Sequence, residues 1–113
     1  MVGEKIKQGD IIKLNLNPTV GHEQAGYRPV LVVNNASYSR ASNMTLVCPI
    51  TNTGRKNPLH VRLNGLATTG FVICDQIRAI DTLARDYRIV ETVDDDTLWE
   101  VCDIIQGLVG IEK

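Results

Sequence analysis

The segment "NPTVGHEQAGYRP", residues 17–29, gathers side chains that can transfer protons or bind phosphate. His22, Glu23 and Gln24 lie between two glycines, and Arg28 stands where an apolar run begins. An imidazole or a carboxylate can give or take a proton, and a guanidinium presents a fixed fork of donors that matches phosphate. Phosphodiester cleavage needs a base, an acid and a cation for the non-bridging oxygens. If the nucleophile is the ribose 2′-OH, the substrate is RNA and not DNA.

The composition is that of an ordinary globular domain. The chain has 113 residues, of which 43% are hydrophobic and 22% charged, which predicts one domain over residues 1–113. The first ten residues have no apolar core, and no apolar run approaches the roughly 20 residues of a membrane helix. We therefore expect a cytoplasmic protein without a signal peptide and without a membrane partner.

The fingerprints of several enzyme classes are missing from the sequence. There is no phosphate-binding glycine loop, no H-E-x-x-H motif and no serine in a nucleophile elbow. His22 and His60 are the only histidines, so we expect neither a metal site nor a cofactor. Three widely spaced cysteines fit neither a zinc site nor a disulfide framework, and we expect all three to be small buried apolar residues.

The charges are unevenly distributed along the chain. Residues 91–103 contain six acidic side chains and no Lys or Arg. The whole chain has a net charge of −1, so the remainder carries about +5. The body of the protein can therefore present a positive surface to a polyanion.

Alternating or continuous apolar patterns predict about six short strands. The expected ranges are 9–16, 28–35, 44–51, 59–63, 71–80 with a bend or bulge near Asp75, and 87–93. Pro49 indicates a sheet edge or a bulge, because proline cannot donate to a ladder. Residues 36–43 are expected to form a polar connection, and residues 81–86 fit one turn of helix.

One helix is expected at the C-terminus. Asp94 is a suitable N-cap, and acidic residues follow in the first turn, where the macrodipole favours them. An apolar stripe then recurs every three or four residues, formed by Leu98, Val101, Cys102, Ile105, Leu108 and Val109. Six short strands and one helix predict a mainly β (α+β) chain built as a small barrel or as packed sheets.

Ordered motifs along nearly the whole chain resemble one known family. "GDIIKLNLNPTVGHEQAGYRPVLVV" is similar to the opening of the MazF/PemK toxin endoribonucleases, with their G-D-I strand, N-P-T turn, E-Q-x-G and R-P-x-L-V. "TLVCPIT", "GFVICDQIRAID" and "LAR" resemble later family segments in the same order. The acidic C-terminal helix resembles the family only in type.

The resemblance implies a compact SH3-like β-barrel of the CcdB/PemK/MazF type with a C-terminal helix, assembled as a homodimer. It implies sequence-selective, metal-independent cleavage of single-stranded RNA, mainly mRNA, leaving 2′,3′-cyclic phosphate and 5′-OH ends. It also implies a cognate antitoxin whose acidic, flexible tail occupies the RNA site.

The resemblance assigns roles to individual residues. Arg28, Thr51, Glu23 and His22 are the expected catalytic residues, with the choice of base between Glu23 and His22 left open. The residues expected to contact RNA are Gln24, Arg55, Lys56, Asp75, Gln76 and Arg78. One branch of the family places an Arg two residues before the Asp of this segment, where this chain has Ile73, so Asp75 and Gln76 can equally satisfy backbone groups at a bend.

Two alternatives remain open at this stage. A non-catalytic toxin of the same fold, such as the gyrase poison CcdB, would have no use for the combination of Glu23, Arg28 and Thr51. A plain RNA-binding barrel would need stacking platforms, and only 4% of the residues are aromatic.

Overall fold

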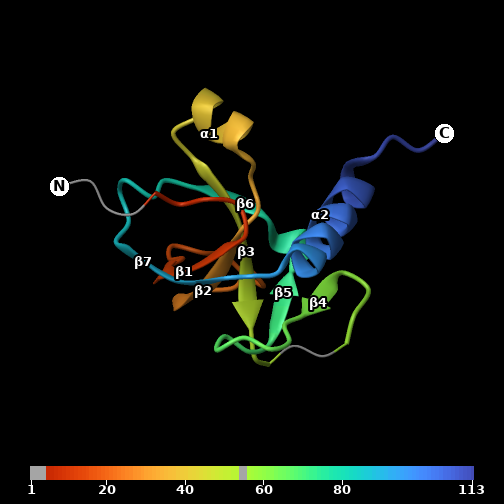
Figure 1. Cartoon of the computed structure of the whole chain (residues 1–113), viewed down its shortest axis with the longest axis horizontal. Coiled ribbons are helices and arrows are strands. Elements are labelled where there is room, and N and C mark those ends of the chain that lie inside the picture. The colour runs from red at the N-terminus through yellow and green to blue at the C-terminus, as the bar shows by residue number, and fades with distance from the viewer. Residues whose placement is uncertain (1–4, 54–55) are drawn as a thin grey trace.

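The fold, given by a computed structural model, is described over residues 5–53 and 56–113. In these residues seven strands form one sheet in the order β4-β5-β3-β2-β1-β7, and β6 also pairs with β3 (Figure 1). The strands are β1 (Asp10–Asn15), β2 (Tyr27–Val32), β3 (Thr45–Thr51), β4 (His60–Arg62), β5 (Phe71–Ile73), β6 (Arg78–Ile80) and β7 (Tyr87–Thr92). The helices are α1 (Ala36–Ala41), η1 (Cys74–Gln76) and α2 (Asp95–Val109). The sheet is barrel-like, but its order ends at β4 and β7 without closing into a ring.

The central strands bury side chains on both faces of the sheet. Ile11 on β1 and Leu31 on β2 belong to one core, which α2 covers, while Ile12 and Val30 belong to a second core on the other face. All four side chains are fully buried. Alternation predicted β1 and a continuous apolar run predicted β2, and both strands are present, although β1 is buried on both faces at its start rather than on one.

Helix α2 begins where the sequence predicts. The Asp94 carboxylate accepts a hydrogen bond from the Thr97 amide at 3.3 Å and one from its hydroxyl at 2.6 Å. Val101 is fully buried, and Leu98 and Ile105 pack against the same core. The predicted apolar stripe is wrong at its end, where Leu108 is 46% and Val109 78% exposed. The last turns of α2 lead away from the sheet, so no strand covers them (Figure 1).

Pro49 does not mark an edge strand or a bulge, because β3 lies inside the sheet. On one side Pro49 pairs with Val30 of β2. On the other side β3 pairs with β6 through Thr45–Val47 and with β5 through Ile50 and Thr51. Pro49 thus occupies the gap between two partners, where a missing amide donor costs no ladder hydrogen bond.

Two connections differ from the sequence expectation. Residues 36–41 form the short helix α1, capped by Asn35, whose side chain accepts from the Tyr38 amide at 3.0 Å. No residue of α1 is buried, so no apolar stripe announced it. Residues 81–86 form a hydrogen-bonded turn and not a turn of helix. The turn is closed by a hydrogen bond of 3.2 Å from the Ala84 amide to the Asp81 carbonyl.

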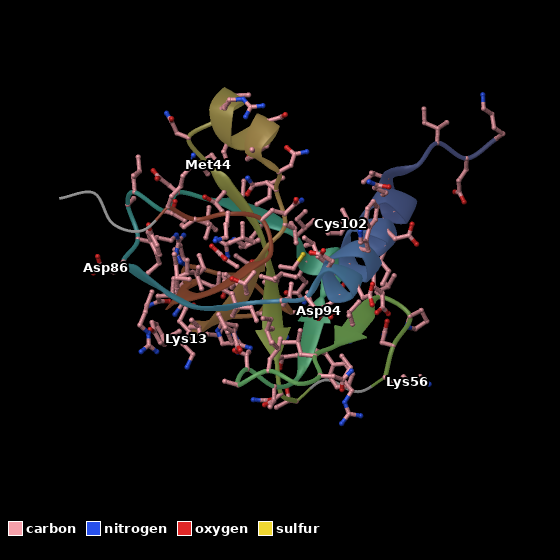
Figure 2. The ribbon with its side chains drawn as sticks, in the orientation of Figure 1. Lys13, Met44, Lys56, Asp86, Asp94 and Cys102 are labelled. Atoms are coloured by element: carbon pink, nitrogen blue, oxygen red, sulfur yellow. The ribbon has the colours of Figure 1, made fainter. Side chains whose placement is uncertain are left out.

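The cysteines follow the expectation in two of three cases. Cys48 and Cys74 are buried, and desolvation raises the pKa of both thiols, that of Cys74 to about 12. Cys102 is half-exposed, and Figure 2 shows it on the side of α2 that faces the sheet. Within the described residues, none of the helices has the length and apolar character needed to cross a membrane.

Candidate active site

The loop between β1 and β2 is fastened at its base. The Arg85 guanidinium donates to the Asn15 carbonyl at 2.6 Å and to the Asn17 carbonyl at 2.8 Å. The Asn17 side chain accepts from the Gly26 amide at 3.1 Å, which joins the two ends of the loop. Gly26 has a φ of +81°, a conformation that favours glycine. The loop that carries the predicted acid–base residues therefore has a defined shape.

Gln76 ties this loop to the bend in the chain at η1. Its side-chain oxygen accepts from the Gln24 amide at 2.8 Å, and its nitrogen donates to the His22 carbonyl at 3.3 Å. The bend predicted near Asp75 is confirmed as η1, and Gln76 there satisfies the backbone of the loop rather than that of the bend itself. The His22 side chain remains exposed.

A hollow of about 220 Å³ brings half of the predicted site residues together. Arg78 is held in its wall by a hydrogen bond of 3.0 Å to the Leu16 carbonyl. The lining residues are Leu16, Glu23, Gln24, Pro49, Asp75, Gln76, Ile77 and Arg78. Ile73, two residues before Asp75, is buried and apolar.

Arg28 lies close to the end of β3 that carries Thr51. The β2–β3 pairing ends at Val30 opposite Pro49, and beyond it the Arg28 side chain reaches β3 at Ile50, the residue before Thr51. The Arg28 guanidinium donates to the Ala25 carbonyl at 2.9 Å and to the Ile50 carbonyl at 3.2 Å. Both acceptors are carbonyl groups, and no carboxylate of residues 5–53 and 56–113 bonds this guanidinium, so its charge remains available to an anion.

The Thr51 hydroxyl makes its hydrogen bonds to Thr53, two residues along the chain. It shares a hydrogen bond of 2.9 Å with the Thr53 hydroxyl and accepts from the Thr53 amide at 3.2 Å. Thr51 is only 6% exposed. Carbonyl groups, and not the Thr51 hydroxyl, therefore orient Arg28.

The RNA contacts predicted for Lys56 and Arg55, after β3, both stay predictions. Lys56 is exposed on the loop that leads into β4 (Figure 2), away from the hollow that holds Gln24 and Gln76. Arg55 lies outside the described residues, and its role stays a prediction.

The loop 64–70 supports Thr51, a role that sequence reasoning missed. Glu91 on β7 accepts from the Ala67 amide at 3.1 Å and from the Thr68 amide at 2.6 Å. The neighbouring Thr69 hydroxyl donates to the Asn52 side chain at 2.8 Å. In the sequence, Glu91 is only one member of an acidic segment. Its hydrogen-bond partners are backbone amides more than 20 residues away, so no sequence pattern indicates them.

Gly70 completes this support by close approach. A Cβ at this position would collide with the Thr51 carbonyl, and the φ of Gly70 is +110°. The contact with Thr51 is visible only once β3 and β5 are paired.

Known proteins share both this sequence and this fold. Residues 7–109 match the family described as PemK-like, MazF-like toxin of type II toxin-antitoxin system. The chain belongs to this family. The Escherichia coli protein named Endoribonuclease PemK is 41% identical over 101 residues, which span 85% of this chain and 76% of that protein.

Solved structures of MazF agree with the fold. The crystal structure of MazF from Deinococcus radiodurans is 31% identical and superimposes with a TM-score of 0.87, over 96% of this chain and 100% of that one. A MazE–MazF crystal structure from the same organism is 29% identical, with a TM-score of 0.80 over 95% and 98% of the two chains. The predicted mainly β fold of the MazF type with a C-terminal helix is confirmed.

Within the described residues of this PemK/MazF-like chain, no group of three or more His, Cys, Asp or Glu side chains is arranged to hold a metal ion. The site instead combines one loop imidazole, several amides and carboxylates, and guanidinium groups that donate to carbonyls. These groups can transfer protons and stabilise an anion.

Gly70→Ala tests the support of Thr51. The substitution adds a methyl group against the Thr51 carbonyl at a positive φ, and we expect it to destabilise the fold by roughly 1–3 kcal/mol. Gly65→Ala is the matched control, because Gly65 also has a positive φ (+72°) but nothing within 4 Å of the added carbon. Urea unfolding of both variants measures the difference. Equal losses for the two would contradict a role for close approach.

The Glu91 clamp predicts a pH dependence of stability. Partial burial raises the pKa of Glu91, but hydrogen bonds from Thr68 and Ala67 outweigh this, so the pKa lies below its ordinary value of 4.5. The stabilisation is therefore present above pH 4.5 and is lost as the pH falls through the lowered pKa. Glu91→Gln should lower Tm at pH 7 and lose most of this effect at pH 3. Glu112→Gln, in the exposed terminus, should change neither value.

Proposed function

We propose that this protein is an endoribonuclease toxin that cuts single-stranded RNA, chiefly mRNA, with some sequence preference. The observation that carries the proposal is the hydrogen bond from Arg28 to the carbonyl group of Ile50, next to Thr51, beside a fastened loop that presents His22 and Glu23. Attack by the ribose 2′-OH on the adjacent phosphorus then yields a 2′,3′-cyclic phosphate and a 5′-OH end. The relatives named endoribonucleases support the same reaction class.

Arg28 supplies the cation of the transition state. Its guanidinium donates to two carbonyl oxygens, which fix its position without neutralising its charge. A fixed donor that faces developing charge needs no reorganisation during the reaction. The Thr51 hydroxyl can donate to a phosphate oxygen once it turns away from Thr53.

The loop geometry favours different roles for His22 and Glu23. One Glu23 oxygen accepts from the Val20 amide at 2.7 Å, so this carboxylate helps to shape the loop. The His22 backbone is anchored by Gln76, while its imidazole is exposed towards solvent. We assign proton transfer to His22, with the second oxygen of Glu23 as the other titratable group within the loop.

The hollow between the loop and η1 is the proposed binding site for bases of the RNA. Gln24, Gln76 and Asp75 offer amide and carboxylate groups that can read base edges, and Arg78 adds a cation. Lys56 and Arg55, on the loop after β3, are assigned to phosphates of the flanking strand. A non-catalytic toxin would not need the acid–base loop beside Arg28.

The proposed partners are an antitoxin and a second copy of the chain. Solved MazE–MazF complexes support an antitoxin, and we assign it an acidic, flexible tail that competes with RNA for the same cations. Exposed apolar side chains such as Tyr27 (63%) and Leu83 (87%) support burial against another chain, here a homodimer. The proposed location is the cytoplasm.

Arg28→Ala tests the chemistry. The wild-type protein should cut a long single-stranded RNA in excess chelator and leave the equivalent DNA intact. The variant should lose about a hundredfold or more in rate, because it lacks the transition-state cation. Primer extension and end analysis measure the cuts and their termini. Arg88→Ala, an exposed arginine on β7, is the control and should cut normally. Cleavage that requires added magnesium would contradict the mechanism.

Competition between RNA and antitoxin tests the partner. An acidic peptide from the antitoxin tail and an uncleavable RNA should exclude each other, and both should bind more weakly as salt rises. Fluorescence anisotropy measures the competition, and light scattering measures the mass of the protein. Simultaneous binding of both ligands, or a monomeric mass at micromolar concentration, would contradict this assignment.

A further inference from the structure

A single row of side chains crosses three strands of the sheet. Thr51 on β3 pairs with Phe71 on β5, and Phe71 pairs with Arg62 on β4. Directly opposite residues in antiparallel strands point to the same face, and neighbouring strands lie about 4.8 Å apart. Arg28 donates to the carbonyl of Ile50, the residue before Thr51, so the proposed reaction centre adjoins the β3 end of this row. Thr51 belongs to that centre, and Phe71 and Arg62 have no assigned role.

The far end of this row opens into a pocket of about 440 Å³. Its walls include Phe71, Arg62, His60 and Lys56. This volume falls within the range of sites that hold small molecules. The pocket is separate from the hollow beside η1, since no residue lines both.

The walls offer the groups that bind a nucleotide. Arg62 and Lys56 are exposed cations in the wall of the pocket, suited to a phosphate. Phe71 is half-buried, and its ring lies 6.5 Å from the His60 ring at an angle of 50°. An aromatic ring at such a position can stack a base of any sequence.

His60 adds a second observation. Its Nδ1 atom is buried and makes no hydrogen bond with any described residue. A buried polar atom without a partner is costly in the free protein. A base in the adjoining pocket brings carbonyl and amino groups to which the ring can bond after a turn of its side chain.

Glu100 is the acidic residue of the wall. A carboxylate repels phosphate but accepts hydrogen bonds from the amino group of a base. The base of the bound nucleotide therefore points towards Phe71 and Glu100, with its phosphate towards Arg62 and Lys56.

We infer that this pocket is a subsite for one nucleotide that flanks the cleaved bond, so that the RNA runs across the strands along the row. The inference rests on the proposed function, because the row is oriented by the reaction centre at Arg28 and Thr51. Phe71 supplies stacking, Arg62 and Lys56 contact the phosphate, and Glu100 favours a base that carries an amino group.

The test uses the full chain and short RNAs. The cut site is first mapped with wild-type protein in chelator. RNAs blocked by a 2′-deoxy group at the attacking nucleotide are then lengthened one nucleotide at a time from each end, and binding is followed by anisotropy. For the wild-type protein, the one added nucleotide that reaches the pocket should raise the affinity for the RNA. Phe71→Leu should remove about fivefold or more of this gain, while Phe71→Tyr keeps it.

The charge variants test the phosphate contact. Arg62→Gln should lower the slope of log affinity against log salt by about 0.7, the value for one contact to a single strand. Arg88→Gln removes an exposed charge from β7 and should leave the slope and the gain per nucleotide unchanged. Glu100→Gln should weaken the base preference at the same position of the cut motif.

Three outcomes overturn the inference. The first is an equal gain per nucleotide in wild type and Phe71→Leu. The second is an unchanged salt slope in Arg62→Gln. The third is that Phe71→Leu and Arg62→Gln both bind RNA normally but no longer bind an acidic antitoxin peptide. That result would make the pocket an antitoxin site. Failure of the wild type to cut RNA in chelator overturns the proposed function instead, and the binding series can then be run on unmodified RNA.

Discussion

The arrangement of the site depends on one constraint, which is that β3 has two partners on the same side. Its first half pairs with β6 and its last residues pair with β5. The chain must therefore bend between β5 and β6, and it does so at η1, with Pro49 of β3 opposite the gap. This bend carries Gln76 to the loop between β1 and β2, and it leaves the β4–β5 hairpin beside Thr51. A continuous strand over residues 71–80 would have separated these parts.

Arginine side chains then hold the site through backbone carbonyl groups. Arg28 donates to Ala25 and Ile50, Arg78 to Leu16, and Arg85 to Asn15 and Asn17. A carbonyl oxygen fixes the position of a guanidinium without cancelling its charge, whereas a carboxylate would do both. The same residues can therefore shape the loop ends and keep a positive potential for a polyanionic ligand.

Local patterns in the sequence predict most of the fold and little of the site. Period-two runs located the strands, and Asp94 located the start of α2, because both signals lie within a few residues. Helix α1 was missed because it buries no side chain. Pro49 was misread because a proline is accommodated at this place in β3 only through the positions of β5 and β6, which lie far along the chain. The support of Thr51 by Glu91 and Gly70 joins residues that are 19 to 24 positions apart and acts on backbone atoms, so no spacing of side chains encodes it.

The sequence predicts that the acidic residues lie apart from the cations of the site, and the structure shows two exceptions to this separation. Most of the acid in residues 91–103 lies on α2, but two carboxylates reach the neighbourhood of the row from Thr51 to Arg62. Glu91 is bound to two amide groups, which hold its pKa down and offset its charge locally. Glu100 lines the same pocket as Phe71, Arg62 and Lys56. The cations of this pocket favour a phosphate, whereas the carboxylate disfavours a phosphate and favours a hydrogen-bond donor. The two kinds of charge therefore distinguish the two ends of a nucleotide, which suits a ligand that must be held in one register.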